Sequence, residues 1–165
     1  MTDDRLQWLV DRSEISETVI RYFRALDLQD WPAMRATLTD TLDLDFSELF
    51  GDPREVVASD DFVGAAPHRM GGFRATQHIS PNHVITIDGD SAEMTAYMNA
   101  WHVVEGPDGI EQTYVLRGSY DITMRRMSDG WRMSRLRMRV WHETGNKDVF
   151  RLSAERYAAL HAAAN

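Results

Sequence analysis

The chain of 165 residues contains no cysteine. This absence excludes disulfides, thiol nucleophiles and zinc–thiolate sites, and it fits a reducing cytoplasm, which is the compartment we expect. Long apolar runs are missing as well, since no stretch approaches the roughly 20 apolar residues that span a bilayer. The opening MTDDRLQWLVDRSE lacks the basic start and apolar segment of a signal peptide. We therefore expect no membrane partner.

Positive charge is scarce: 18 Lys and Arg face 26 Asp and Glu, a net charge of −8. Nucleic-acid partners and anionic membrane surfaces both require clustered basic residues, so the sequence argues against either. It also contains no GxGxxG or P-loop motif, no HExxH and no clustered carboxylate loop. These absences predict a protein that uses neither a metal nor a nucleotide cofactor.

The first half of the chain predicts helices. Asp11 and Glu14 have the spacing of a capping box, which would start a helix at this point. A second, short helix should follow Asp30 and end near Leu38. TLDLDFS predicts a short strand, and GDPREVVASDDFVGAA predicts a turn followed by a helix. The first helix is amphipathic, with one apolar stripe at helical spacing formed by Ile15, Val19, Tyr22, Phe23 and Leu26.

The second half changes to strand periodicity. Four alternating runs at about 76–87, 92–104, 112–125 and 131–142 are separated by the turn sequences DGDS, EGPDG and SDG. They predict a meander of antiparallel strands, and a last helix follows at about 152–162. Helices followed by a sheet indicate an α+β fold. We expect a strongly curved, cone-shaped sheet, mixed or antiparallel, covered by the N-terminal helices, with a cavity at its open end.

Two histidines are candidate site residues. A hairpin centred on Asp88-Gly89 pairs residues whose numbers sum to about 177, which sets His78 opposite residue 99 and diagonally near His102. Both rings would then reach one cavity, while His83 faces away. Histidine titrates near neutral pH and is the commonest general acid or base. The alternative is that both are polar strand positions satisfied by a neighbour or by water.

Three stretches resemble one known family. VIRYFRALDLQDWPAMRATLTDTLDLDFS, QHISPNHVITIDGDSAEMTAYMNAWH and LRGSYDITMRRMSDGWRMSRLRMRVWHETGN are similar, in this order, to SnoaL-like proteins of the NTF2-like superfamily. The likeness covers roughly 6–145 and points to the branch of scytalone dehydratase, bile-acid dehydratase and a dehydrochlorinase. It implies one NTF2-like, cystatin-like α+β barrel domain over 1–145, with a C-terminal helical extension over 146–165.

The resemblance also implies roles for residues. His78 matches the histidine that moves a proton, and Asp27 matches the aspartate that supports it. Tyr22 and His102 match groups that bind or protonate a substrate oxygen. The chain departs from the dehydrochlorinase, which has a lysine at the position of Tyr22 and an arginine at about that of Leu136. Without the resemblance, the sequence alone favours Asp27 as a residue that ends the helix, and it leaves Tyr22 open as an aromatic residue of the core.

Strand parity separates the two faces of the last strand. Leu136 and Met138 should line the cavity, together with Phe46 and Trp101 as pocket or core side chains. An arginine set, Arg135, Arg137 and Arg139, should lie outside and pair with acids or with a second subunit. His68 is expected in a loop.

The function that we expect is metal-free lyase or isomerase chemistry on a small, largely apolar polycyclic, steroid-like or polyketide-like molecule. Many relatives pair through the outer face of the sheet, so a homodimer or higher homo-oligomer is expected. Two alternatives remain open. One is a ligand-binding protein without catalysis, and the other is a structural subunit resembling the small subunits of ring-hydroxylating dioxygenases.

Overall fold

The computed structural model describes residues 2–162. Five helices and seven strands lie within this range. In chain order they are α1 (Thr2–Asp27), α2 (Trp31–Arg35), β1 (Leu38–Asp45), α3 (Ser47–Phe50), β2 (Glu55–Ala58), α4 (Ser59–Met70), β3 (Ala75–Ile79), β4 (Val84–Asp88), β5 (Ser91–Glu105), β6 (Glu111–Met127), β7 (Gly130–Gly145) and α5 (Val149–Ala162).

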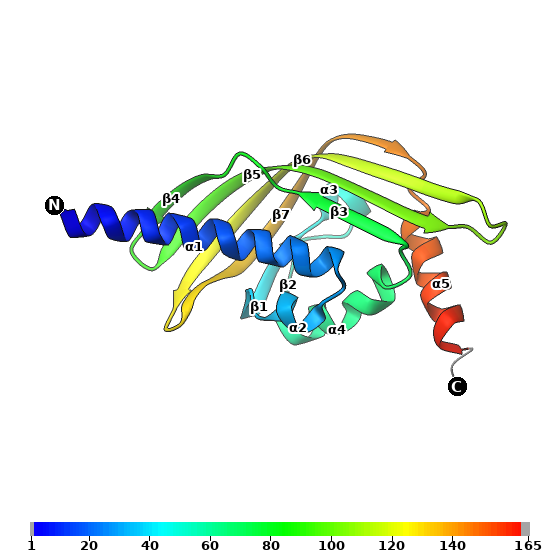
Figure 1. Ribbon diagram of the computed structural model, residues 1–165, viewed down its shortest axis with the longest axis horizontal. Coiled ribbons are helices and arrows are strands. Elements are labelled where there is room, and N and C mark those ends of the chain that lie inside the picture. The colour runs from blue at the N-terminus through cyan, green and yellow to red at the C-terminus, as the bar shows by residue number, and fades with distance from the viewer. Residues whose placement is uncertain (1, 163–165) are drawn as a thin grey trace.

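One curved, mixed sheet forms the body of the molecule. Its strand order is β2-β1-β7-β6-β5-β3, and β4 also pairs with β5. Every pairing is antiparallel except that of β1 with β7. Figure 1 shows the long strands β5, β6 and β7 arching behind α1, with α2 and α4 below and α5 at the far end. The expected α+β fold, with a curved sheet covered by N-terminal helices, is confirmed.

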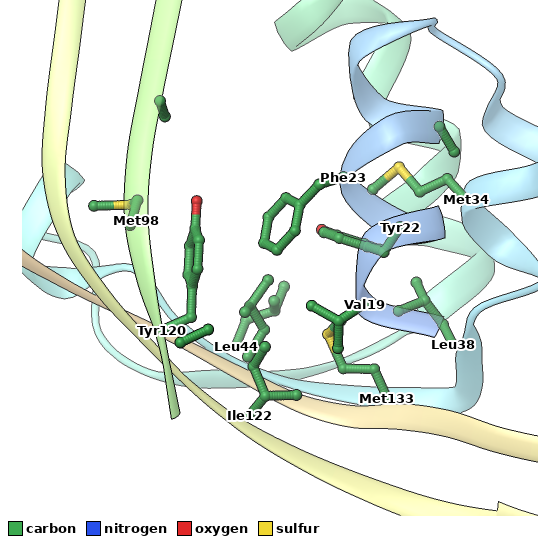
Figure 2. Close-up of a cluster of buried hydrophobic side chains, with 14 of the residues drawn as sticks. Val19, Tyr22, Phe23, Met34, Leu38, Leu44, Met98, Tyr120, Ile122 and Met133 are labelled. Carbon is green, nitrogen blue, oxygen red and sulfur yellow. The ribbon is translucent and has the colours of Figure 1, made fainter. Parts of the chain in front are cut away.

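The core lies between α1 and the sheet. The helix buries its apolar stripe, including Val19 and Phe23, and β5 alternates buried and exposed residues along most of its length. Figure 2 shows Val19 beside Met133 and Phe23 facing Tyr120. Each such side chain contributes about 1.5–3 kcal/mol when it is fully buried. The packing therefore fixes the last turns of α1 against the sheet, and this is where the candidate site lies.

The predicted capping box at Asp11 is wrong. Helix α1 begins at Thr2, so Asp11 lies in its interior. The carboxylate is almost fully buried and accepts hydrogen bonds from Arg126 and from the indole Nε1 of Trp131. These partners come from β6 and β7. They explain why an aspartate occupies an inward position of the helix, where a local motif suggests a helix start.

The first predicted strand run is interrupted. Segment 80–83 separates β3 from β4, and Asn82 in it has a positive φ of 62°. The hairpin turn lies one residue later than expected, so Asp88 pairs with Ser91. His78 pairs with Ala100 rather than residue 99. Because directly paired residues share a face, this one-residue correction sets His78 on the same face as His102.

The other elements match the predictions in part. Helix α2 follows Asp30, whose carboxylate accepts a hydrogen bond from the Ala33 amide at 3.0 Å, as expected. The short elements α3 and β2 were not predicted from sequence. His68 lies in α4, not in a loop. Helix α5 packs against α4, and Arg156 donates a hydrogen bond to the carbonyl of Gly72 at 2.8 Å.

None of the helices within residues 2–162 combines the length and apolar character that crossing a membrane requires.

Candidate functional site

Asp27 and His78 form a hydrogen-bonded pair where α1 ends beside β3. The imidazole Nδ1 of His78 lies 2.6 Å from Oδ1 of Asp27. The other carboxylate oxygen accepts the backbone N–H of His78 at 2.8 Å, and the hydroxyl of Thr76 donates to Oδ1 at 2.8 Å. Three hydrogen bonds thus hold the carboxylate against one edge of the imidazole. The Phe23 ring stacks on His78 at a centroid distance of 5.8 Å and holds its plane.

This arrangement sets the protonation of the pair. Burial by itself would raise the pKa of Asp27, but the hydrogen bonds and charge of His78, with the hydroxyl of Thr76, lower it below its usual value. Asp27 is therefore ionised at neutral pH and accepts the Nδ1–H of His78. The second nitrogen, Nε2, then carries the lone pair in the neutral ring. This geometry allows His78 to accept a proton at Nε2, with Asp27 placed beside the ring to stabilise an imidazolium.

His78 lines a cavity of about 330 Å³ under the curved sheet. Most of its wall is apolar and comes from α1, α2, α3, α4, α5 and the strands β5, β6 and β7. The volume lies at the lower end of the range for small-molecule pockets. Such a space can accommodate a small apolar ring compound.

His102 lies beside His78 in the same cavity. The two rings meet edge to face with centroids 5.2 Å apart. Burial lowers the pKa of His102 to about 3, and the neighbouring His78 acts in the same direction. Its Nδ1 is buried and has no hydrogen-bond partner among the described residues. His102 is thus a neutral ring with one buried polar atom that no described residue satisfies.

The low pKa of His102 makes the fold sensitive to acid. The unfolded chain binds a proton at this residue below about pH 6.5, whereas the folded protein does so only near pH 3. Stability is therefore lost as pH falls between these values, by up to about 1.4 kcal/mol per pH unit. In urea titrations from pH 7 to 4, the free energy of unfolding of His102→Phe should rise relative to that of the wild type as pH falls. A difference that stays constant with pH would contradict this explanation.

Two phenols also contribute to the cavity wall. Tyr22 on α1 and Tyr120 on β6 are both buried and both line it. Figure 2 shows the two side chains approaching from opposite elements, with the Phe23 ring between them. Burial raises the pKa of both hydroxyls above the ordinary value. The Tyr120 hydroxyl has no partner within residues 2–162. Both phenols therefore stay protonated and can donate hydrogen bonds to a ligand oxygen.

Three of the four predicted apolar residues line this cavity, namely Phe46, Leu136 and Met138. Trp101 does not. It is 40% exposed and lies across the sheet, in a separate hollow of about 620 Å³ that also borders Asp27. The reason is parity: His102 points into the cavity, so its neighbour in the strand points outward.

The arginine set lies outside the cavity and pairs with acids, as expected. Arg135, Arg137 and Arg139 approach Asp43, Asp45 and Asp121 at 3.7, 3.2 and 2.8 Å. His83 is also outside the cavity lining and contacts the Ser80 carbonyl at 2.6 Å. Within residues 2–162 no group of three or more His, Asp or Glu side chains is arranged to hold a metal ion.

Several lining residues were not among the candidates predicted from sequence, including Tyr120, Arg69, Asp52 and Phe150. Tyr120 could have been found, since it alternates with Leu116 and Ile122 in the same predicted strand. Arg69 was hidden because Pro67 and the glycines that follow it suggested a loop. Asp52 lies in the connection between α3 and β2, and Phe150 lies in the first turn of α5, which begins three residues before the predicted helix.

A family model described as SnoaL-like domain matches residues 7–137. Among curated proteins, a scytalone dehydratase-like protein of Passalora fulva is 31% identical over 71 residues. This match covers 41% of the present chain and 44% of that protein, so the chain spans less than half of its length.

Solved structures extend the likeness to nearly the whole fold. A protein of Kribbella flavida is 33% identical with a TM-score of 0.80, over 86% of this chain and 97% of its own. An NTF2-like protein with a cystatin-like fold from Novosphingobium aromaticivorans is 20% identical with a TM-score of 0.62, over 85% and 88% of the two chains. The chain therefore belongs to the SnoaL-like domain family and has the NTF2-like, cystatin-like fold that its sequence predicts.

Proposed function

We propose that the protein is a metal-free lyase that removes water from a small hydroxylated ring ketone, with His78 as the base and Asp27 as its supporting carboxylate. The observation that carries this proposal is the 2.6 Å contact between Asp27 and Nδ1 of His78, which leaves Nε2 free at an apolar cavity. The likeness to a scytalone dehydratase-like protein supports dehydration as the reaction.

The chemistry follows from the placement of these groups. Nε2 of His78 removes a proton from the carbon next to the ketone, and Asp27 stabilises the imidazolium that forms. Tyr22 donates a hydrogen bond to the ketone oxygen as negative charge develops on it. The C–O bond on the next carbon then breaks, and the imidazolium returns its proton to the departing hydroxide. A carbon–carbon double bond and one water are the products.

His102 supports the reaction as a neutral group. Because its pKa is about 3, it carries no charge at neutral pH and does not compete with His78 for a proton. Its unpartnered Nδ1 can accept a hydrogen bond from the hydroxyl of the substrate. This contact would hold the leaving group near His78.

The size of the cavity narrows the expected substrate. A volume of about 330 Å³ suits a molecule of one or two rings better than a four-ring steroid. The wall offers polar atoms from only a few side chains, so most of the ligand surface must be apolar.

A simple compound tests the proposal. In 3-hydroxy-1-tetralone, loss of water gives 1-naphthol, which absorbs strongly in the near ultraviolet. We expect the protein to accelerate this reaction above its rate in buffer, and absorbance follows it directly. Saturable binding of the compound without any acceleration would favour the alternative of a non-catalytic ligand-binding protein.

We also propose that the protein forms a homodimer through the outer face of the sheet. Tyr97, Trp101 and Trp141 are exposed there, and the rings of Tyr97 and Trp141 meet at 5.5 Å. A second copy would cover these aromatic side chains. Light scattering should give twice the monomer mass for the wild type and the monomer mass for Trp141→Asp. A monomeric wild type would contradict the proposal.

A further inference from the structure

Arg69 is the one Lys or Arg side chain among the described residues that lines the cavity. It lies in the last turn of α4, and its guanidinium carbon is 5.4 Å from the centroid of the Phe62 ring. Phe62 lines the cavity too, so the aromatic face directs the side chain along the wall.

The positive charge of Arg69 is not neutralised by an acidic side chain of the described residues. Within residues 2–162 no carboxylate forms an ion pair with it, although the chain is strongly acidic. The arginines of β7 show the contrast, because each of Arg135, Arg137 and Arg139 has an acidic partner. Asp52 lines the same cavity but does not pair with Arg69 either.

The field of this charge reaches the polar end of the cavity. The guanidinium lowers the pKa of Tyr22 against the larger effect of burial. An unpaired cation therefore lies close enough to act on a ligand that occupies the space beside Tyr22.

We propose that Arg69 determines substrate specificity by binding an acidic oxygen, a carboxylate or phenolate, carried by the ring compound in the cavity. This rests on the proposed function only in that the cavity is where the substrate binds. Guanidinium binds such oxygens through charge-assisted hydrogen bonds, often two at once, and the apolar wall strengthens them. The substrate is then a hydroxylated ring ketone that also bears an acidic group, and Arg69 fixes which end of it faces His78.

Binding of two matched probes tests the assignment without any turnover. 2-Naphthoate and 2-acetylnaphthalene share the two-ring skeleton, but only the first is charged at neutral pH. Isothermal titration calorimetry should show that the wild type prefers 2-naphthoate. In Arg69→Gln the Kd for 2-naphthoate should rise roughly tenfold, in line with the loss of a charge-assisted hydrogen bond, while that for 2-acetylnaphthalene stays within about twofold.

Three further variants sharpen the test. Arg69→Lys should recover part of the affinity, since the charge remains. Asp52→Asn should tighten 2-naphthoate slightly, because a negative charge at the cavity is removed. Arg74→Gln, which alters an arginine paired with Glu111 outside the cavity, should change neither affinity.

A wild type that does not prefer 2-naphthoate, or Arg69→Gln affecting both probes equally, would overturn the assignment. Because His78→Gln should keep the preference for 2-naphthoate while losing dehydration, the two proposals can fail separately.

Discussion

Replacing His78 by glutamine should lower kcat/KM for the dehydration of 3-hydroxy-1-tetralone by roughly 10²–10⁴-fold, the usual contribution of a positioned general base. Glutamine keeps polar atoms near Asp27 but has no basic nitrogen to direct at the substrate. The His78 side chain lies at the cavity wall rather than in the main core, so the variant should fold. Progress curves measure the rate, and circular dichroism with urea titration checks the fold.

Two further variants show whether the loss of rate is specific to His78. Asp27→Asn should lower the rate by up to about 10⁴-fold, because an amide no longer fixes the Nδ1–H tautomer of the ring or supports the charge of its imidazolium. His142→Gln alters an exposed histidine of β7 outside the cavity lining and should leave the rate unchanged. If His78→Gln retained the wild-type rate, His78 would not be the base, and the proposed function would lose its main support.

Replacing Asp11 by alanine should lower the free energy of unfolding by about 2–3 kcal/mol, because a buried carboxylate and its charge-assisted hydrogen bonds are lost. The substitution removes one of the two acidic partners of the Arg126 guanidinium: Asp11 lies at 2.6 Å from it, and the second partner, Asp90, lies at 3.0 Å. It also leaves the buried indole N–H of Trp131 without an acceptor. Since the contacts of Asp11 with Arg126 and Trp131 join α1 to β6 and β7, the long N-terminal helix would lose its attachment to the sheet at this point. Urea denaturation measures the change.

The exposed pair of Glu17 and Arg21 on the same helix provides a control. Glu17→Ala should cost only about 0.3–0.5 kcal/mol, because solvent already screens this pair. Acid should reproduce the effect of Asp11→Ala, since Arg126 lowers the pKa of Asp11 to about 2. The stabilisation is complete above the unfolded pKa of about 3.9 and is lost as pH falls towards 2. Equal losses in the two variants would show that Asp11 is no anchor.

Periodicity explains which parts of the fold were predictable. Alternation in β5, β6 and β7 is long enough to identify the strands and their buried faces, and so Leu136 and Met138 were assigned to the cavity. The pairing register of neighbouring strands does not follow from this alternation. The irregular segment at 80–83, with the positive φ of Asn82, shifts the pairing of His78 by one residue, and no periodic pattern encodes this shift.

Long-range contacts explain most of the rest. Asp11 suggested a helix start because its partners, 115 and 120 residues away, are invisible to a local pattern. The pairing of Asp27 with His78 was predicted from family resemblance, since periodicity alone favoured a helix terminator. Arg69 reaches the cavity because α4 continues through Pro67, where the sequence suggested a loop.

The central claim, that His78 moves a proton in this cavity, has a direct test that does not require the natural substrate. 1-Tetralone has the acidic protons beside its ketone but no hydroxyl to lose. In heavy water, the wild type should accelerate the exchange of these protons for deuterium, as followed by proton nuclear magnetic resonance, and His78→Gln should abolish that acceleration. Exchange that proceeds equally in both proteins, or at the rate of buffer in both, would contradict the account.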